Sequence, residues 1–320
     1  MRAMNRSETL EIIRRHSLQP TRSLGQNFLV DDRVIGMAVS AAAPDADTLV
    51  IEIGPGLGGL TRALAIDAGR VLAIEIDRHI LPALQEVVSP FPCVDIVHAD
   101  AMQADFKHLT SSWQTQGKII KVAANLPYYI TSPLVEKLIS ELPCLQSLTL
   151  MVQKEAGDRL AATPGSRLYG PVAILAALFG SVKKLARVPA SAFYPKPHVD
   201  SVLIHLQRHV DGKTVDAAVR DTLPESDADA AVRDTLPESD ADAAVRDTLP
   251  DSDTEAFLSF LNDCFSRRRK TLVNSLGDAG WSKEKRNCVR QILSSLKLAE
   301  NVRPEQIKPE EYARIYLLLM

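Results

Sequence analysis

The sequence of 320 residues is poor in cysteine and contains no long uninterrupted apolar run. Its four cysteines, Cys93, Cys144, Cys264 and Cys288, are far apart and form no CxxC pair, which fits neither a zinc site nor a disulfide framework. We therefore expect no metal and a reducing, cytoplasmic environment. No apolar run reaches the roughly 18 residues that span a bilayer, and the charged N-terminal stretch does not resemble a secretory signal. These features argue against membrane insertion and secretion.

The chain also lacks a large net charge, because an acidic segment offsets a basic remainder. It carries 37 basic and 40 acidic side chains, a formal net charge of −3. Residues 211–255 hold 14 acidic and 4 basic groups, a net of −10, so the rest of the chain carries +7, of which +5 lies in residues 256–320. This balance is compatible with a polyanionic partner, although an ordinary solvated surface produces it equally well.

The acidic segment is built from a tandem repeat. Residues 216–254 read DAAVRDTLPESDA twice and then DAAVRDTLPDSDT, a period of 13 residues. Repeats of solenoid proteins are longer, about 20 residues or more. Each copy has few large apolar side chains with which to offset its ordering entropy. We predict a disordered acidic insert over residues 211–255, between folded domains at 1–210 and 256–320.

Residues 1–210 alternate apolar runs with helical stretches. The runs that predict buried parallel strands are Thr48–Ile53, Arg70–Ile76, Val94–His98, Ile119–Ala123 and Leu148–Val152, with later strands at Val182–Val188 and Val199–Leu206. From Glu255 onward the pattern is helical, beginning with EAFLSFLNDCFSRRRKTLVNSL. The sequence therefore predicts a doubly wound α/β sheet followed by a small all-helical domain.

Glycines and carboxylates occur where the predicted strands end, which is where such sheets bind ligands. Gly54, Gly56 and Gly59 follow the first strand with GxGxxG spacing, a pattern that dinucleotide and S-adenosylmethionine (SAM) sites share. Glu75 ends the second strand and suits ribose hydroxyls, and Asp100 follows the third, placed to meet an adenine amino group. Each carboxylate alone is compatible with an exposed strand end. Together they favour a nucleotide-like ligand.

The predicted fourth strand ends in Asn125-Leu126-Pro127-Tyr128. The Asn125 amide and the Pro127 carbonyl offer acceptors, and Tyr128 offers an aromatic face. This set suits the exocyclic amino group of a stacked base, and the Asn-Leu-Pro-Tyr signature is typical of amino-group methyltransferases. The alternative is a plain strand-to-helix turn.

In combination these motifs resemble the ribosomal RNA adenine N6-dimethyltransferase family. Further matching stretches are LGQNFL (24–29), EID (75–77), DAM (100–102), QKE (153–155), SAFYPKPHVDS (191–201) and FSRRRKTL (265–272). The resemblance covers roughly 22–210 and 256–320. It implies a class I SAM-dependent methyltransferase fold, Rossmann-like with a mostly parallel seven-stranded sheet, and a small helical C-terminal domain. The acidic repeat departs from the family pattern.

The resemblance also implies roles for particular residues. The implied SAM-binding residues are Asn27, Leu29, Gly54, Gly56, Glu75, Asp100, Ala101 and Asn125. The implied base-facing, catalytic residues are Asn125, Pro127, Tyr128 and Phe193. Phe193 would be a second aromatic plate opposite Tyr128, with a packed core position as the competing interpretation. The basic run Arg267, Arg268, Arg269 and Lys270 would contact RNA phosphates, whereas a solvated helix face is the alternative.

The implied activity is SAM-dependent N6,N6-dimethylation of two adjacent adenosines. The target would be a hairpin loop near the 3′ end of 16S rRNA in an assembling small ribosomal subunit, and the enzyme would be monomeric. Three alternatives stay open: a nicotinamide-dependent dehydrogenase on the same sheet, an RNA-binding assembly factor with a decayed site, and a methyltransferase for large-subunit rRNA.

Overall fold

The structure is a computed structural model that describes residues 4–21, 25–127, 130–209, 254–267 and 269–320. The acidic repeat up to residue 253, Tyr128 and Arg268 lie outside the described residues. The chain forms two compact units, one of Met1–Ala161 with Ser181–Arg208 and one of Ala162–Gly180 with His209–Met320. Residues 162–180 thus group with the helical C-terminal part, whereas the predicted boundary had placed them in the first domain.

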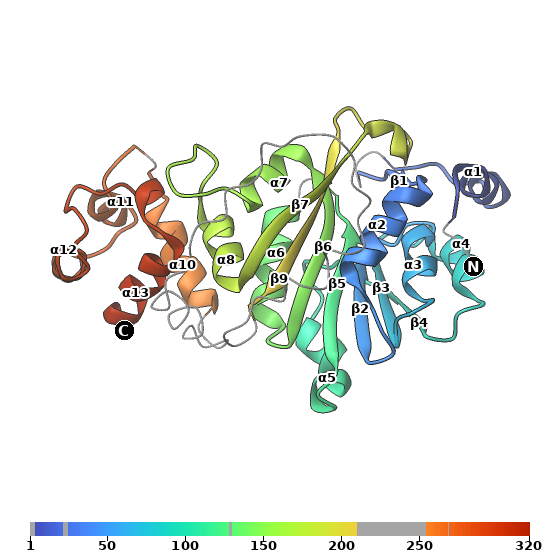
Figure 1. Ribbon diagram of the computed structural model, residues 1–320, viewed down its shortest axis with the longest axis horizontal. Helices are drawn as coiled ribbons and strands as arrows, with labels where there is room; N and C mark the ends of the chain where they lie inside the picture. The colour runs from blue at the N-terminus through green and yellow to red at the C-terminus, as the bar shows by residue number, and fades with distance from the viewer. Residues whose placement is uncertain (1–3, 22–24, 128–129, 210–253, 268) are drawn as a thin grey trace. The chain divides into compact units, whose positions relative to one another are not determined.

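Seven strands of the first unit form one sheet in the order β4-β3-β2-β5-β6-β9-β7 (Figure 1). Their bounds are β2 Thr48–Ile53, β3 Arg70–Glu75, β4 Val94–His98, β5 Ile119–Asn125, β6 Leu145–Gln153, β7 Gly180–Val188 and β9 Ser201–Arg208. Strands β2 to β6 pair in parallel, and β9 is antiparallel to β6. The predicted mostly parallel seven-stranded α/β sheet is confirmed.

Helices of this unit cover both faces of the sheet. They are α1 Arg6–Arg15, α2 Asp32–Ala42, α3 Gly59–Leu64, α4 Leu81–Val88, α5 Phe106–Thr115, α6 Thr131–Glu141 and α7 Lys154–Leu160. Val50 of β2 packs in the core beneath α2 and α3, whereas its neighbour Leu49 lines a hollow with Trp113 of α5. Because successive strand residues point to opposite faces, α5 lies on the face opposite α2 and α3. Burial on both faces explains why β2 reads as a largely apolar run instead of an alternating one.

A second sheet consists of two short strands, β1 (Phe28–Leu29) and β8 (Phe193–Tyr194), paired antiparallel with Leu29 opposite Phe193. Phe28 packs in a cluster with residues of α1 and α4, and Leu29 packs in the core beneath α2 and α3. The LGQNFL segment is therefore anchored on both sides.

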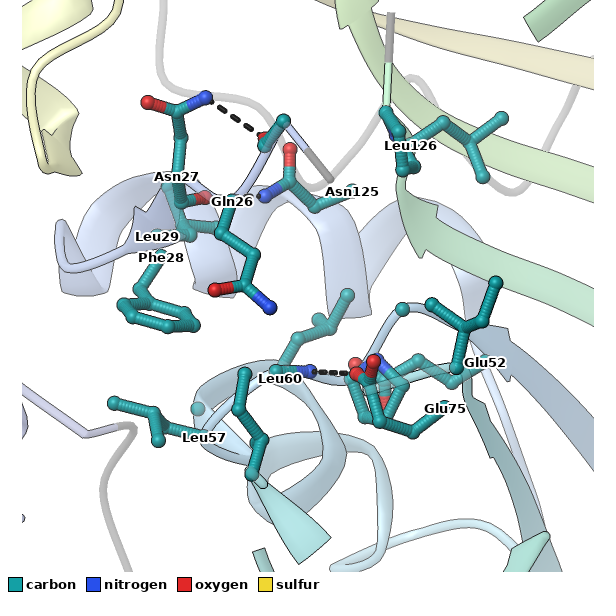
Figure 2. A pocket seen from close by; sticks show the side chains of 18 of the residues that line it. Gln26, Asn27, Phe28, Leu29, Glu52, Leu57, Leu60, Glu75, Asn125 and Leu126 are labelled. Atoms are coloured by element: carbon teal, nitrogen blue, oxygen red, sulfur yellow. Dashed lines mark hydrogen bonds between the residues drawn. The ribbon is translucent and has the colours of Figure 1, made fainter. Parts of the chain in front are cut away.

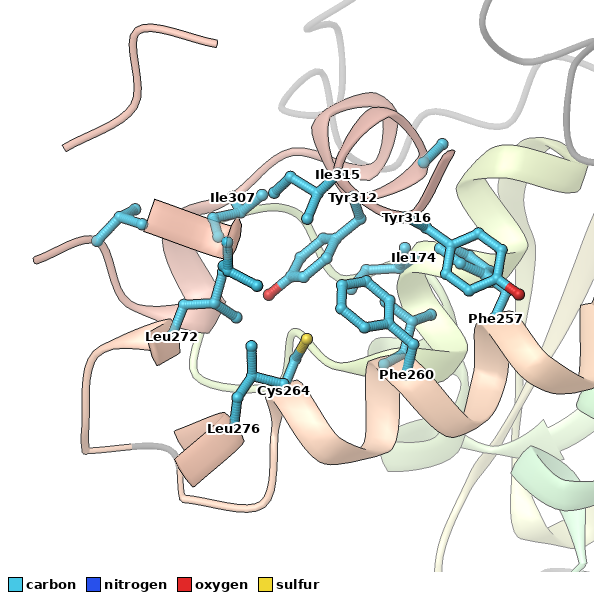
Figure 3. Close-up of a cluster of buried hydrophobic side chains, with 14 of the residues drawn as sticks. Ile174, Phe257, Phe260, Cys264, Leu272, Leu276, Ile307, Tyr312, Ile315 and Tyr316 are labelled. Atoms are coloured by element: carbon cyan, nitrogen blue, oxygen red, sulfur yellow. The ribbon is translucent and has the colours of Figure 1, made fainter. Parts of the chain in front are cut away.

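The second unit consists of helices around one apolar cluster (Figure 3). They are α8 Pro171–Phe179, α10 Thr254–Cys264, α11 Leu272–Asp278, α12 Lys283–Ser295 and α13 Pro309–Leu319, with a 3-10 turn at Pro304–Gln306. Phe260 lies at the centre, with its ring 5.7 Å from that of Tyr316 and 6.0 Å from that of Trp281. The stretch predicted as one helical run from Glu255 is two helices, since α10 ends at Cys264 and α11 begins at Leu272.

Candidate active site

A cavity opens at the carboxyl ends of β2 and β5. The chain runs from β2 to β3 on one side and returns to β5 on the other, so this is the point where the strand order reverses and α/β sheets bind ligands. The cavity has an empty volume of about 820 Å³, including space open to solvent. Figure 2 shows residues from the N-terminal segment, the glycine turn and the end of β5 around it. The predicted residues that line it are Asn27, Leu29, Gly54, Gly56, Glu75, Asn125 and Pro127.

The glycine turn forms the floor of the cavity. Gly54 and Gly56 have φ values of +69° and +56°, a left-handed conformation that favours glycine. A Cβ added at Gly56 would lie 2.9 Å from the Phe28 ring. The turn therefore requires glycine both for its backbone conformation and for the close approach of β1.

Two buried carboxylates face the cavity from β2 and β3. Glu75 is 4% exposed, and its Oε2 accepts a hydrogen bond from the Gly56 N–H at 3.1 Å while its Oε1 accepts one from the Asp77 N–H at 2.9 Å. Glu52 is 2% exposed, and its Oε2 has no hydrogen-bond partner within the part of the chain that the structure describes. Burial raises the pKa of Glu52 to about 8 and also raises the pKa of Glu75.

An unpartnered buried carboxylate oxygen beside a second carboxylate is the right environment for a cationic ligand. SAM carries positive charge on its sulfonium and on its ammonium group. The donor set therefore fits SAM: Glu75 suits the ribose, and the glycine turn allows a close approach. The sequence prediction assigned no role to Glu52 or Gln26. Their polar side chains, directly before the glycine turn and before Asn27, were the signal that could have identified them.

Asn125 is held at the end of β5 by the N-terminal segment. Its Nδ2 donates to the Asn27 carbonyl at 2.9 Å (Figure 2). Its Oδ1 accepts no hydrogen bond from the described residues. This bond uses one of the two Nδ2 hydrogens and fixes the orientation of the amide, so Oδ1 and the second N–H remain for a ligand. The neighbouring Pro127 carbonyl accepts a long hydrogen bond of 3.4 Å from Ile130 and retains a second lone pair.

Asn27 and Leu29 reach the cavity from β1 and the turn before it. The Asn27 side chain bonds back to the Gly25 carbonyl at 2.9 Å, so its main-chain carbonyl is the group that engages Asn125. Leu29 is 7% exposed and belongs to the core beneath α2 and α3. The structure thus brings the LGQNFL segment to the pocket as expected, but chiefly through its backbone and apolar side chains.

Among the described residues predicted to bind SAM or the base, Asp100, Ala101 and Phe193 do not line this cavity. Asp100 lies beyond β4 and caps its own turn, accepting from the Met102 N–H at 2.9 Å and from Gln103 Nε2 at 3.1 Å. Ala101 beside it is buried. Phe193 is 2% exposed and packs in the core opposite Leu29, the alternative that the sequence had left open. Their roles toward the adenine moiety and the target base stay predictions.

Arg267, Arg269 and Lys270 of the predicted RNA-contacting run lie between α10 and α11, not on a helix face. Asp278 of α11 forms an ion pair with Lys270, whose Nζ lies 2.7 Å from Asp278 Oδ2. Arg267 Nε lies 3.6 Å from the same oxygen. These pairs lower the pKa of Asp278, with the Lys270 hydrogen bond as the main cause. Arg267, Arg269 and Lys270 are all exposed. Surface pairs of this kind are weak, so they leave the charges free to exchange partners.

No group of His, Cys, Asp or Glu side chains among the described residues is arranged to hold a metal ion. In the same part of the chain, none of the helices has the length and apolar character needed to cross a membrane.

The chain is similar to a known protein family and to curated proteins over most of its length. Residues 18–221 match the family model described as ribosomal RNA adenine dimethylase. The chain is 33% identical over 332 residues to "Ribosomal RNA small subunit methyltransferase A" of Natranaerobius thermophilus, covering 100% of this chain and 98% of the relative. A protein of the same name from Alkaliphilus oremlandii is 34% identical over 305 residues, covering 95% and 93%.

Two solved structures share the fold. A dimethyladenosine transferase from Plasmodium falciparum superposes with a TM-score of 0.66 at 24% identity, covering 91% of this chain and 96% of that one. The 23S rRNA methyltransferase ErmE gives a TM-score of 0.58 at 22% identity, covering 92% and 99%. The predicted family, fold class and dependence on SAM are confirmed. The chain belongs to the ribosomal RNA adenine dimethylase family of SAM-dependent methyltransferases.

Proposed function

We propose that this protein transfers methyl groups from SAM to the N6 atoms of two adjacent adenosines. The proposed target is a hairpin loop near the 3′ end of 16S rRNA, in the assembling small subunit in the cytoplasm. The observation that carries the proposal is the hydrogen bonding of Asn125. Its Nδ2 donates to the Asn27 carbonyl at 2.9 Å, beside a cavity lined by the glycine turn and Glu75. The full-length similarity to proteins named as small-subunit rRNA methyltransferases favours this subunit over the large one.

The reaction depends on hydrogen-bond acceptors beside the adenine amine more than on a general base. The N6 amine of adenine is a poor nucleophile, because its lone pair is delocalised into the ring. Hydrogen bonds from the amine N–H groups to Asn125 Oδ1 and to the Pro127 carbonyl would favour the pyramidal, nucleophilic form of the amine, because the two oxygens are fixed dipoles. SAM supplies an electrophilic methyl group, and the chain contributes by holding the amine in line with it.

No strong general base is needed, because the amine becomes acidic once it is methylated. The second methylation follows if the pocket has room for the first methyl group, since N6 then keeps one proton to be accepted. The base must leave its stack to reach such a pocket, and loops of RNA allow this. We propose that Tyr128 stacks against the base, and that Arg267, Arg268, Arg269 and Lys270 contact phosphates of the substrate. A second aromatic plate from Phe193 would require its ring, which is 2% exposed, to leave the core.

Mass spectrometry of nucleosides tests the proposal. Small subunits that lack the modification would be incubated with the protein and SAM, and their rRNA digested. We expect N6,N6-dimethyladenosine at two neighbouring positions of 16S rRNA. The Asn125→Ala protein is the matched negative control, and 23S rRNA is the competing substrate. Methyl transfer to 23S rRNA alone, or binding of subunits without any transfer, would contradict the proposal.

A further inference from the structure

A chain of hydrogen bonds joins the N-terminal segment to the glycine turn through residues that have no assigned role. The side-chain amide of Gln26 is bonded at both ends: its Oε1 accepts from the Thr21 N–H at 2.7 Å, and its Nε2 donates to Asp77 Oδ2 at 2.7 Å. Gln26 and Asp77 are 51 residues apart in sequence. This is therefore a tertiary contact between the LGQNFL segment and the loop after β3.

The chain continues from Asp77 to the proposed ribose-binding residue. Asp77 is 7% exposed, and its Oδ1 accepts from the His79 N–H at 2.9 Å. Its own N–H donates to Glu75 Oε1 at 2.9 Å, and Glu75 Oε2 accepts from the Gly56 N–H at 3.1 Å. A carboxylate that is buried and bonded on both oxygens has a fixed position. The orientation of Glu75 is thus tied to the position of Gln26.

Gln26 also forms part of a shared wall. Gln26, Phe28 and Ile80 line both the cavity of the active site and a second hollow, which includes Thr21 and Asp77. The next residue, Asn27, holds the Asn125 amide. Beyond it, β1 pairs over only two residues with β8, and so short a strand pair has little stability of its own. The Gln26–Asp77 bond is a second anchor for this wall.

We propose that Gln26 and Asp77 are positioning residues that latch the wall formed by residues 25–29 onto the end of β3 and so govern how long SAM stays bound. Neither side chain needs to touch the reacting atoms. The inference rests on the proposed function only in taking SAM as the ligand of this cavity. Loss of the latch should speed SAM dissociation and leave the methyl-transfer step unchanged once the site is saturated.

The test uses a charge swap across the latch in the full chain. Gln26→Glu places a second carboxylate against Asp77 and should raise the calorimetric Kd for SAM about tenfold or more, since a bond to a charged group is lost. Adding Asp77→Asn lets the new glutamate accept from the asparagine NH2, while the asparagine oxygen still accepts from His79. The double variant should return to within about twofold of the parent. Gln114→Ala is the control, because it removes an amide that bonds only to Thr110 on α5.

Two further readouts separate latching from a general loss of structure. In the complex with the demethylated product, residues 25–30 of Gln26→Glu should exchange amide hydrogen faster than in the parent, with recovery in the double variant. The turnover rate at saturating SAM should stay within about twofold, with the effect confined to KM. A Kd for Gln26→Glu within twofold of the parent, or a double variant no tighter than the single one, would overturn the latch.

The outcome remains informative if a single variant does not fold, because the double variant and Gln26→Ala report on the same bond. Failure of the proposed function is distinguishable: a parent protein that does not bind SAM contradicts that function. A parent that binds SAM, with latch variants of equal affinity, contradicts only the latch.

Discussion

Buried polar groups have different surroundings in the active site and in the core of the helical unit. In the helical unit, the Tyr169 hydroxyl donates to the Ile307 carbonyl at 2.9 Å and the Tyr312 hydroxyl donates to the Pro304 carbonyl at 2.8 Å. Burial raises the pKa of both tyrosines, so both remain protonated donors. In the active site, Glu52 Oε2 and Asn125 Oδ1 find no partner among the described residues.

Arg286 Nε and Glu305 Oε2 of the helical unit also lack a partner among the described residues, but they lie outside its apolar cluster. The difference therefore holds between that cluster and the active site. Buried polar groups are normally satisfied, and an exception calls for an explanation. The two tyrosines make their bonds during folding and serve stability. The two oxygens of the active site are buried or half-buried without a bond, which is unfavourable until a ligand provides one. Substitutions in the two regions should therefore separate into effects on chemistry and effects on stability.

The largest expected effect is on catalysis. Asn125→Ala removes the amide oxygen that would accept a hydrogen bond from the amine, and we expect the methyl-transfer rate to fall by about 100-fold or more. SAM affinity should fall much less, because the glycine turn and Glu75 remain. Single-turnover transfer and calorimetry measure the two separately. Near-normal turnover would refute the role given to Asn125.

The helical core should show the opposite behaviour. Phe260→Ala leaves a cavity among Phe257, Tyr312 and Tyr316 and should cost about 3–5 kcal/mol of unfolding free energy. Denaturant unfolding measures the loss, with the partly exposed Leu317→Ala as control. SAM affinity should remain within about twofold under conditions where the variant is folded. A marked loss of SAM affinity in the folded variant would break the comparison between the two regions.

The two acidic residues of the pocket should differ in the property that they control. Glu75→Ala leaves ribose hydroxyls and the Gly56 N–H without an acceptor and should weaken SAM binding by about 1–3 kcal/mol. Calorimetry at fixed pH measures this change. Unchanged affinity would mean that the ribose lies elsewhere.

Glu52 should instead make the unfolding free energy depend on pH. Its pKa is raised to about 8 in the folded protein against 4.5 for the free side chain. The folded state therefore retains a proton that the unfolded chain has lost between these values, and the unfolding free energy falls as pH rises through this window. Without ligand, the parent should lose on the order of 3 kcal/mol relative to Glu52→Gln between pH 5 and 8.

Denaturant unfolding at several pH values checks this dependence, with the exposed Glu255→Gln as the control. Parallel pH profiles of the parent and Glu52→Gln would show that Glu52 is ionised in the empty pocket.

Much of the sheet could be predicted from the sequence. Strands β2 and β4 have the bounds that were expected. Buried β2 reads as a largely apolar run, whereas β4 is a half-buried edge strand that contains Asp95 and His98. The convergence of Gly54, Glu75 and Asn125 also followed from the sequence, since the carboxyl ends of parallel strands meet at one edge. Helices such as α2 and α8 were not predicted, and the strongly apolar α8 gave no clear helical period.

The contacts between distant segments depended on the tertiary structure. The sequence could not show that Phe193 is buried opposite Leu29, that Asp278 pairs with Lys270, or that Gln26 meets Asp77. Local patterns record which side chains prefer to be buried and where strands end. The partner of a buried polar group depends instead on the three-dimensional approach of segments far apart in the chain, and burial by that approach is what raises the pKa of Glu52.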